Sequence, residues 1–148
     1  MEKPKSIGRY ISCIYRNFHI YLHHQLEDYH LGSGQVHFLM MLYKYEKVNQ
    51  EKIAEYLHID KATVARALKK LEQEDYILRK KDESDRRNYN IFLTEKAKHL
   101  QPKIRSILHY WTQQLLDGID EENQDQLFNL LEKITINAMK TNQQEPNE

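Results

Sequence analysis

Several features that define whole classes of proteins are scarce or absent in this sequence. It has one cysteine, Cys13, so no disulfide bond can form within the chain and a cytoplasmic protein is expected. No apolar run approaches the roughly 20 residues that a membrane-spanning helix needs. Glycine-rich phosphate and dinucleotide loops, a Gly-x-Ser-x-Gly motif and a Cys-x-x-Cys pair are also lacking. We therefore expect no membrane segment, no cofactor and no enzyme.

Net charge is absent too, since 22 lysine and arginine residues balance 22 aspartate and glutamate residues. This balance argues against a protein that binds nucleic acid by bulk positive charge. The charges are nevertheless separated along the chain. Residues 61–81 hold seven basic and three acidic side chains, whereas residues 113–148 hold two basic and eight acidic ones. The neutral total is therefore a cancellation between a basic middle and an acidic C-terminal part.

Helical periodicity is the main pattern that the sequence does contain. Apolar residues at spacings of three and four predict one long amphipathic helix over residues 5–29. After the break "HLGSGQ", Ser33 is the expected N-cap of a second helix that ends near Glu46. Two long helices are expected after residue 94, the first containing Pro102 and the second capped by Asp120.

Two short helices are expected between these long ones. Asn49 and Asp60 are the expected N-caps of "QEKIAEYLHI" and "KATVARALKKLEQEDY". In the second helix, apolar residues form one stripe, and cations with a threonine occupy the other faces. Two short helices joined by "HID" are typical of a helix-turn-helix, whose second helix enters the major groove of DNA. A solvated helix with a few lysines is the alternative.

After Tyr76 the periodicity changes from 3.6 to 2, and "ILRKK" and "YNIFLT" predict a β-hairpin with the polar tip "DESDRRN". A hairpin that follows a recognition helix is a wing, and an arginine at its tip can enter the minor groove. Asp85 precedes Arg87 by two residues. We expect its carboxylate to accept a charge-assisted hydrogen bond from the Arg87 guanidinium and so to fix that side chain before DNA binds. The alternative is a polar tip with incidental charges.

The stretch "DESDRRNYNIFLT" resembles the signature of the MarR family of winged helix-turn-helix transcription regulators, Asp-x-Arg followed by Leu-Thr, at Asp85, Arg87, Leu93 and Thr94. "NQEKIAEYLHIDKATVARALKKLEQEDYILRKKD" is similar to the family's helix-turn-helix and first wing strand. The resemblance implies a mainly α fold with a small β-hairpin wing, flanked by long dimerisation helices. It also implies a homodimer that binds a pseudo-palindromic operator on double-stranded DNA, with repression as the expected role, and that is released by a small ligand or an oxidant.

The expected division is one MarR-like domain over residues 1–148, with a DNA-binding lobe at about 34–94 and dimerisation helices at about 5–29 and 95–140. Within the lobe, nine residues are expected at the DNA. The major groove is assigned to Lys61, Thr63, Arg66 and Lys69, phosphates to Lys70 and Arg79, and the wing contacts to Asp85, Arg86 and Arg87. Arg87 is expected in the minor groove, with Arg86 on the neighbouring backbone, and the sequence leaves open which of the two arginines reaches the groove floor.

Apolar residues on more than one face of the long helices predict dimerisation independently of the resemblance. A two-fold partner would bury Ile14, Phe18, Trp111, Leu115, Leu127, Leu130 and Ile134, which a thin winged domain does not cover. The alternative is a self-contained helical core. A helical protein–protein adaptor is a further alternative, but such a protein would have no use for a wing.

A small anionic aromatic effector is one possibility for what the protein senses. The resemblance implies a ligand pocket where the dimerisation helices meet the DNA-binding lobe. Arg16 would pair with a carboxylate there, and His37 and Tyr43 would line the pocket.

Peroxide and metal ions are the other possibilities. Cys13 has Arg16 three residues on, which favours a reactive thiol, although a small buried hydrophobic residue is the preferred interpretation. His19, His23 and Glu27 recur every four residues on one helix face, but no further ligand for a metal sensor is identifiable. No resident metal is therefore expected.

Overall fold

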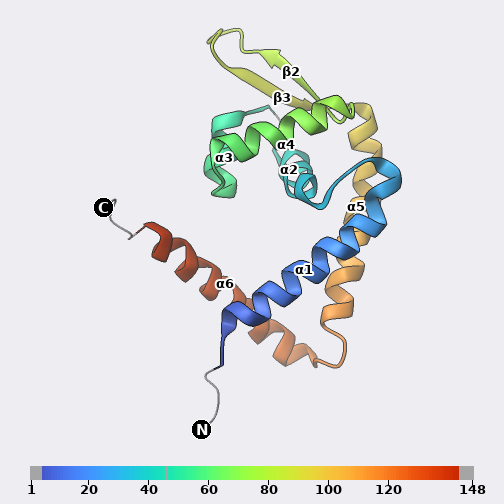
Figure 1. The fold of residues 1–148 in the computed structure, drawn as a ribbon, viewed down its shortest axis with the longest axis vertical. Coiled ribbons are helices and arrows are strands. Elements are labelled where there is room, and N and C mark those ends of the chain that lie inside the picture. The colour runs from blue at the N-terminus through green and yellow to red at the C-terminus, as the bar shows by residue number, and fades with distance from the viewer. Residues whose placement is uncertain (1–4, 46, 144–148) are drawn as a thin grey trace. The chain divides into compact units, whose positions relative to one another are not determined.

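The computed structural model describes residues 5–45 and 47–143. Its elements are α1 (Ile7–Leu26), the 3₁₀ turn η1 (Glu27–Tyr29), α2 (Ser33–Lys44), β1 (Val48–Asn49), α3 (Gln50–Leu57), α4 (Lys61–Gln73), β2 (Ile77–Lys81), β3 (Tyr89–Leu93), α5 (Glu95–Leu115) and α6 (Glu121–Gln143). The chain forms two compact units, Met1–His109 and Tyr110–Glu148, and α5 continues from the first into the second. The mainly α fold with a small wing is as expected (Figure 1).

The helix starts follow from local hydrogen bonds. The expected caps are confirmed at Asn49, Asp60 and Asp120, whose side-chain oxygens accept from the backbone amides of Lys52, Thr63 and Asn123. The expected cap at Ser33 is wrong. Gly32 is the N-cap of α2, because its amide donates to the side chain of Gln35 (2.8 Å), and Ser33 is the first helical residue.

The sheet has one strand more than the hairpin that the sequence predicts. Strands pair antiparallel in the order β1-β3-β2, with Ile77 opposite Leu93 and Lys81 opposite Tyr89. The additional strand β1 places Val48 opposite Ile91. Because β1 immediately precedes α3, this pairing ties the start of the helix-turn-helix to the wing.

The core of the first unit is built from the apolar stripes of its helices and the inner face of the sheet. In α4 the stripe expected from the sequence, Val64, Leu68 and Leu71, is fully buried. Tyr76 is buried as well, and its hydroxyl donates to the Tyr29 carbonyl oxygen (2.7 Å). The helix α4 packs against α2, α3 and β2, so its opposite face is left to solvent (Figure 1).

The second unit contains the end of α5, a turn and α6. Gly118 in the turn has a φ of 77°, a left-handed conformation that favours glycine. No residue of α6 between 121 and 142 is buried, although the helix carries several leucines and isoleucines. In the part of the chain that the structure describes, no helix is both long and apolar enough to cross a membrane.

The apolar residues expected at a dimer interface retain surface in the single chain. Ile14, Leu115 and Leu130 are exposed, whereas Phe18, Trp111, Leu127 and Ile134 are half-buried. The long helices therefore carry more apolar surface than their own units cover.

Candidate nucleic-acid interface

The exposed face of α4 begins with an organised N-terminal turn. Asp60 accepts from the hydroxyl (2.7 Å) and from the backbone amide (2.9 Å) of Thr63, and these bonds, led by that of the hydroxyl, hold the pKa of the Asp60 carboxyl below its usual value. The Thr63 hydroxyl in turn accepts from Nη2 of Arg66 (3.0 Å). Asp60 thus fixes the first turn of α4, and through Thr63 it holds the Arg66 guanidinium against that turn.

The cations of α4 that are expected at the DNA are all exposed. Lys61, Arg66, Lys69 and Lys70 are exposed, while Thr63 is half-buried. Lys61 makes an ion pair with Glu51 at the start of α3 (3.4 Å), and both side chains are largely exposed. Because an exposed ion pair of this kind is weak, the Lys61 ammonium can exchange Glu51 for another anion.

Arg79 sits deeper than the other basic residues. It lies on β2, its Nε atom is 3.2 Å from Oε2 of Glu72 on α4, and its side chain is about one-quarter exposed. The Nε–H is not directed at that oxygen, so the contact is an ion pair without a hydrogen bond. Arg79 therefore has N–H groups left to donate.

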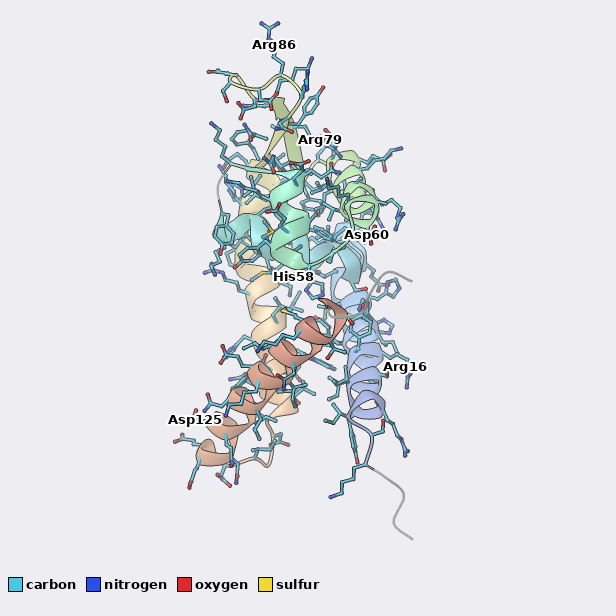
Figure 2. All side chains as sticks on the ribbon, turned by 90° about the vertical axis from the view of Figure 1, so that its left-hand side faces the viewer. Arg16, His58, Asp60, Arg79, Arg86 and Asp125 are labelled. Atoms are coloured by element: carbon cyan, nitrogen blue, oxygen red, sulfur yellow. The ribbon has the colours of Figure 1, made fainter. Side chains whose placement is uncertain are left out.

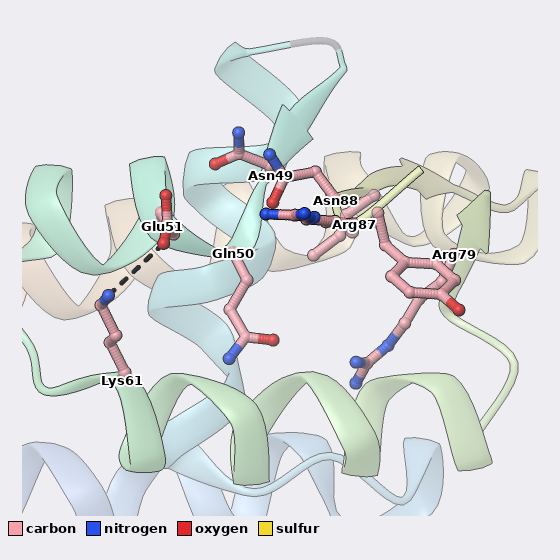
Figure 3. Close-up of a pocket in the computed structure, with 9 residues that line it drawn as sticks. Asn49, Gln50, Glu51, Lys61, Arg79, Arg87 and Asn88 are labelled. Atoms are coloured by element: carbon pink, nitrogen blue, oxygen red, sulfur yellow. Dashed lines mark hydrogen bonds and ion pairs between the residues drawn. The ribbon is translucent and has the colours of Figure 1, made fainter. Parts of the chain in front are cut away.

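A groove of about 220 Å³ separates the wing from the helix-turn-helix. Asn49, Gln50 and Lys61 line it on the helix side, and Arg79 and Arg87 on the wing side. Figure 3 shows Arg87 extending from the wing toward the start of α3, and Arg79 pointing toward α4. Two guanidinium groups and a lysine thus gather around one groove, against the single carboxylate of Glu51, so this part of the surface has a positive potential.

The wing tip corrects one expectation from the sequence. Asp85 accepts from the backbone amide of Arg87 (3.0 Å) and from the side-chain amide of Asn88 (3.1 Å). Among the ion pairs of the described residues there is none between Asp85 and the Arg87 guanidinium. Because an Asp readily bonds to a backbone amide two residues on, it shapes the loop and leaves both arginine side chains exposed. Arg86 projects from the tip of the wing (Figure 2).

Asp82 is the wing residue that sequence reasoning missed. One of its oxygens accepts from the amide of Ser84 (2.8 Å), from the Ser84 hydroxyl and from the amide of Asp85 (3.2 Å). The other accepts from the side-chain amide of Asn90 on β3 (2.7 Å). These bonds, led by that of the Ser84 hydroxyl, hold the pKa of the Asp82 carboxyl far below its usual range. The spacing Asp-x-Ser at a turn was the available signal.

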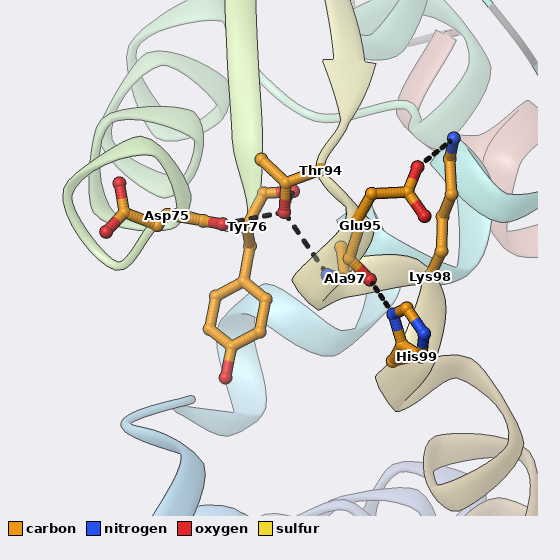
Figure 4. A network of polar contacts seen from close by, with 7 residues as sticks. All are labelled: Asp75, Tyr76, Thr94, Glu95, Ala97, Lys98 and His99. Atoms are coloured by element: carbon orange, nitrogen blue, oxygen red, sulfur yellow. Dashed lines mark hydrogen bonds and ion pairs between the residues drawn. The ribbon is translucent and has the colours of Figure 1, made fainter.

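The end of the wing is anchored to α5 by Thr94 (Figure 4). Its hydroxyl donates to the Asp75 carbonyl (2.7 Å) and accepts from the amide of Ala97 (3.2 Å), while its own amide donates to the Tyr76 carbonyl (3.1 Å). Leu93 before it pairs with Ile77 in the sheet. The Leu-Thr pair therefore joins the last wing strand, the end of α4 and the start of α5.

The three residues expected to bind a ligand do not together line any of the described cavities. The Tyr43 hydroxyl donates to the Ala97 carbonyl (2.6 Å), and burial raises the pKa of Tyr43 to about 12. His37 keeps exposed surface, yet partial burial and the nearby His19 lower its pKa. Arg16 is exposed on α1 (Figure 2). Tyr43 lines a cavity with Leu42, Ile91 and Gln101, and neither Arg16 nor His37 belongs to that lining.

The residues considered for sensing an oxidant or a metal ion also lie differently from what the sequence suggested. Cys13 is exposed, so the interpretation as a buried hydrophobic residue is wrong for the single chain. The ring of His19 is half-buried, and its Nδ1 atom contacts the Ser33 hydroxyl, while His23 and Glu27 are exposed. Across residues 5–45 and 47–143, no group of three or more His, Cys, Asp or Glu side chains is placed to hold a metal ion.

Comparisons with known proteins agree with this architecture. The model of the MarR family matches residues 31–89. The uncharacterized HTH-type transcriptional regulator YybA of Bacillus subtilis (strain 168) is 33% identical over 113 residues, which cover 76% of this chain and 75% of YybA. A MarR transcriptional regulator from Methanosarcina mazei Go1 is 44% identical, and its crystal structure covers 91% of this chain and 97% of its own with a TM-score of 0.85.

A further similar structure contains nucleic acid. It is that of a MarR family transcriptional regulator from Listeria monocytogenes complexed with a 26mer DNA, with 27% identity, a TM-score of 0.86, and coverage of 98% of this chain and 99% of that one. Proteins of this family are transcription regulators, so the expectation of a regulator and not an enzyme is confirmed. The chain belongs to the MarR family of winged helix-turn-helix, DNA-binding transcription regulators.

Proposed function

We propose that this protein is a homodimeric repressor in the cytoplasm that binds a pseudo-palindromic operator and is released by a small ligand. The observation that supports the DNA contact most strongly is the two-sided character of α4. One side, with Val64, Leu68 and Leu71, is fully buried, and the other presents exposed cations beside an arginine-bearing wing. The similar Listeria protein was crystallised with DNA. A helix of this kind is suited to the major groove, where its cations meet base edges and phosphates.

The roles of the α4 residues in the proposed complex follow from their contacts. Lys61, Arg66 and Lys69 read or clamp the major groove, and Thr63 assists by holding the Arg66 guanidinium in place (3.0 Å). Lys70 contacts phosphate.

The wing contributes on the other side of the groove. Arg79, already ion-paired with Glu72, contacts a phosphate next to the groove beside α3. Arg87 enters the minor groove, and Arg86 contacts the adjacent backbone. Asp85 orients the loop through the Arg87 amide and the Asn88 side chain, without pairing with the guanidinium.

Dimerisation is supported by the apolar surface of the long helices. In α6 the exposed residues include Phe128, Leu130, Leu131, Ile136 and Met139. Exposed apolar residues in this number are typical of a helix that is covered in an assembly, and a second copy related by a two-fold axis is the simplest partner. Such a dimer would present two α4 helices to two half-sites about one DNA turn apart.

Release by an oxidant is a second candidate, favoured by the exposure of Cys13. If peroxide releases the protein from DNA through this thiol, Cys13→Ser abolishes the release. Release that persists in the Cys13→Ser protein would remove this candidate.

The proposed DNA binding is tested by a mobility-shift titration on the DNA upstream of the protein's own gene, at several salt concentrations. We expect binding that survives an excess of unrelated DNA and weakens steeply with salt, because phosphate contacts release counterions. Failure to prefer any sequence at any salt concentration would overturn the proposal.

A further inference from the structure

The groove between the wing and the helix-turn-helix contains one acidic side chain beside its cations. Glu51, the second residue of α3, lines this groove together with Lys61, Arg79 and Arg87. Its carboxylate lies 3.4 Å from the Lys61 ammonium (Figure 3). None of the proposed DNA contacts involves this carboxylate. Because a carboxylate that faces phosphates weakens binding, its place in a groove directed at DNA requires a physical reason.

The helix starts that carry the two charged groups are held firmly. Asn49 caps α3 by accepting from the amide of Lys52 (2.9 Å), and Asp60 caps α4 by accepting from the amide of Thr63 (2.9 Å). The helices α3 and α4 also pack against each other. The ammonium and the carboxylate are therefore presented side by side on a backbone that does not depend on DNA for its conformation.

The two side chains remain available to a partner. The Glu51 side chain is 62% exposed and the Lys61 side chain is 74% exposed. Within residues 5–45 and 47–143 neither side chain takes part in another ion pair. An exposed ion pair of this kind contributes little free energy, so both groups can bond to DNA without the loss of a strong contact.

The position of the pair places it at base edges in the proposed complex. Lys61 is the first residue of α4, and the N-terminal residues of a recognition helix contact base edges in the major groove. The only hydrogen-bond donors that the bases present in this groove are the amino groups of cytosine and adenine. Since an ionised carboxylate can only accept, these amino groups are the base atoms to which Glu51 can bond.

A G·C base pair matches the two charges better than an A·T pair does. Its edge presents the guanine acceptors N7 and O6 and then the cytosine N4 donor. A lysine at the two acceptors and a carboxylate at N4 satisfy all three groups. In an A·T pair the adenine N6 donor is followed by the thymine O4 acceptor, which repels a carboxylate placed at N6.

We propose that Glu51 and Lys61 together recognise one G·C base pair in each half-site of the operator. The Glu51 carboxylate accepts from N4 of cytosine, and the Lys61 ammonium donates to guanine. This specificity rests on the proposed DNA binding and adds to it a residue that rejects wrong sequences. Where the cytosine amino group is missing, the carboxylate is left at the interface without a donor, which is costly.

Selection of binding sites from random duplex DNA by the full chain is the first test. The wild type is expected to enrich a site with cytosine opposite guanine at one position of each half-site. Glu51→Ala is expected to lose the preference at that position and to keep the others. Glu55→Ala is the matched control, because it removes an exposed carboxylate from the same helix outside the groove lining, and it is expected to enrich the same site as the wild type. Thermal melts establish that each variant is folded.

Removal of a single group from the DNA isolates the hydrogen bond. In the selected site the cytosine is replaced by 2-pyrimidinone, which lacks the 4-amino group and leaves the guanine in place. The wild type is expected to bind this DNA roughly tenfold to one hundredfold more weakly, which corresponds to a hydrogen bond to a charged group. Glu51→Ala is expected to lose much less, because it has no carboxylate to leave unpaired. Fluorescence anisotropy measures the four affinities.

Several results would overturn the role of Glu51. One is an equal loss of affinity for the 2-pyrimidinone DNA in the wild type and Glu51→Ala, and another is enrichment of adenine in place of cytosine. A third is a Glu51→Ala protein that binds every sequence more tightly with unchanged preferences, since Glu51 would then only repel phosphates. If the wild type enriches no sequence, the proposed function itself fails. If Glu51→Ala enriches the same site as the wild type, the role of Glu51 alone fails.

Discussion

At the wing tip, the carboxylates of Asp82 and Asp85 accept hydrogen bonds from backbone amides, whereas the side chains of Arg86 and Arg87 are exposed. Asp82 and Asp85 together accept hydrogen bonds from three backbone amides, those of Ser84, Asp85 and Arg87. The acids therefore fix the path of the loop, which reduces the conformational entropy lost when the loop docks on DNA. The arginines keep their full donor capacity for phosphates and bases.

Removal of the Arg87 side chain tests the proposed minor-groove contact. Arg87→Ala is expected to weaken operator binding by roughly 1 to 3 kcal/mol, because a desolvated arginine contact is lost while the fold is untouched. Fluorescence anisotropy with operator DNA measures the affinity, and a thermal melt checks the fold. Lys103→Ala, another exposed cation, is the control. Unchanged affinity in Arg87→Ala would refute the placement of this residue.

Asp82 governs how the wing responds to acid. Its folded-state pKa is lower than the ordinary value of 3.8, so its carboxylate stabilises the wing at every pH above that value. The contribution is lost as the pH falls through the lowered folded-state pKa. We expect slow amide hydrogen exchange at Ser84 and Asp85 to persist near pH 4, and Asp82→Asn to abolish it with little change in the melting temperature of the core.

The matched comparison for Asp82 is Asp85→Asn, which disturbs the contacts of Arg87 and Asn88 but leaves the Ser84 amide bonded to Asp82. Protection at Ser84 should therefore survive in Asp85→Asn. If both substitutions removed it equally, Asp82 would have no special role in the loop.

At the scale of helices and strands, the predictions that succeeded depend on short-range chemistry. Asn49, Asp60 and Asp120 cap helices because a side chain and an amide three residues on are within reach in any context. The prediction that Ser33 caps α2 was wrong. The Ser33 hydroxyl contacts Nδ1 of His19 on α1, and the sequence does not reveal this contact between two helices. The strand β1, with two residues, is too short for any periodicity and exists only through its pairing with β3.

In the candidate DNA interface, too, some features follow from the local sequence and others depend on the folded conformation. The exposure of Arg66 and Lys69 could be predicted from the helical period, since these residues lie opposite a buried stripe. Lys61 precedes Val64 by three residues and is exposed as the first residue of α4. The contact of Asp85 with the Arg87 amide could not be predicted. Whether this carboxylate bonds to a guanidinium or to a backbone amide depends on the backbone conformation of the loop. The cavity lined by Leu42, Tyr43, Ile91 and Gln101 joins residues up to about 60 positions apart in the chain, so no local pattern signals it.

Substitutions of two adjacent residues of α4, Leu68 and Lys69, are expected to change different properties, namely stability and DNA binding. Leu68 is fully buried, so Leu68→Ala is expected to lower the free energy of unfolding by about 2 to 5 kcal/mol. Lys69 is exposed, so Lys69→Ala is expected to change stability by less than about 0.5 kcal/mol and to weaken DNA binding. Urea titration and anisotropy measure the two quantities. A large loss of stability in Lys69→Ala would contradict the assignment of its side chain to solvent.

At the scale of the whole molecule, α6 is the element that a single chain does not explain. A helix of 23 residues without a buried residue between 121 and 142 has little reason to be stable in water, since most helical stability comes from packing of an apolar face. A partner that covers this helix would account for its apolar residues. The acidic C-terminal part and the basic middle would then serve different surfaces, one for assembly and one for DNA.

A charge within this apolar surface should disrupt assembly. Leu130 is 48% exposed in the single chain, and Leu130→Asp is expected to shift the protein from dimer to monomer at micromolar concentration, because an unpaired carboxylate is costly to bury. Sedimentation equilibrium measures the change, with Lys103→Asp as the control. A wild-type protein that sediments as a monomer would refute the dimer.

The central claim is that two copies of α4 and its wing recognise one operator, and hydroxyl-radical footprinting of the upstream DNA tests it most directly. The wild type is predicted to protect two segments whose centres lie about 10 to 10.5 base pairs apart, or a multiple of this. A protein carrying both Arg66→Ala and Arg87→Ala is predicted to lose this pattern while remaining folded. Protection that is a single segment, that appears equally on unrelated DNA, or that persists in the double variant would contradict the account.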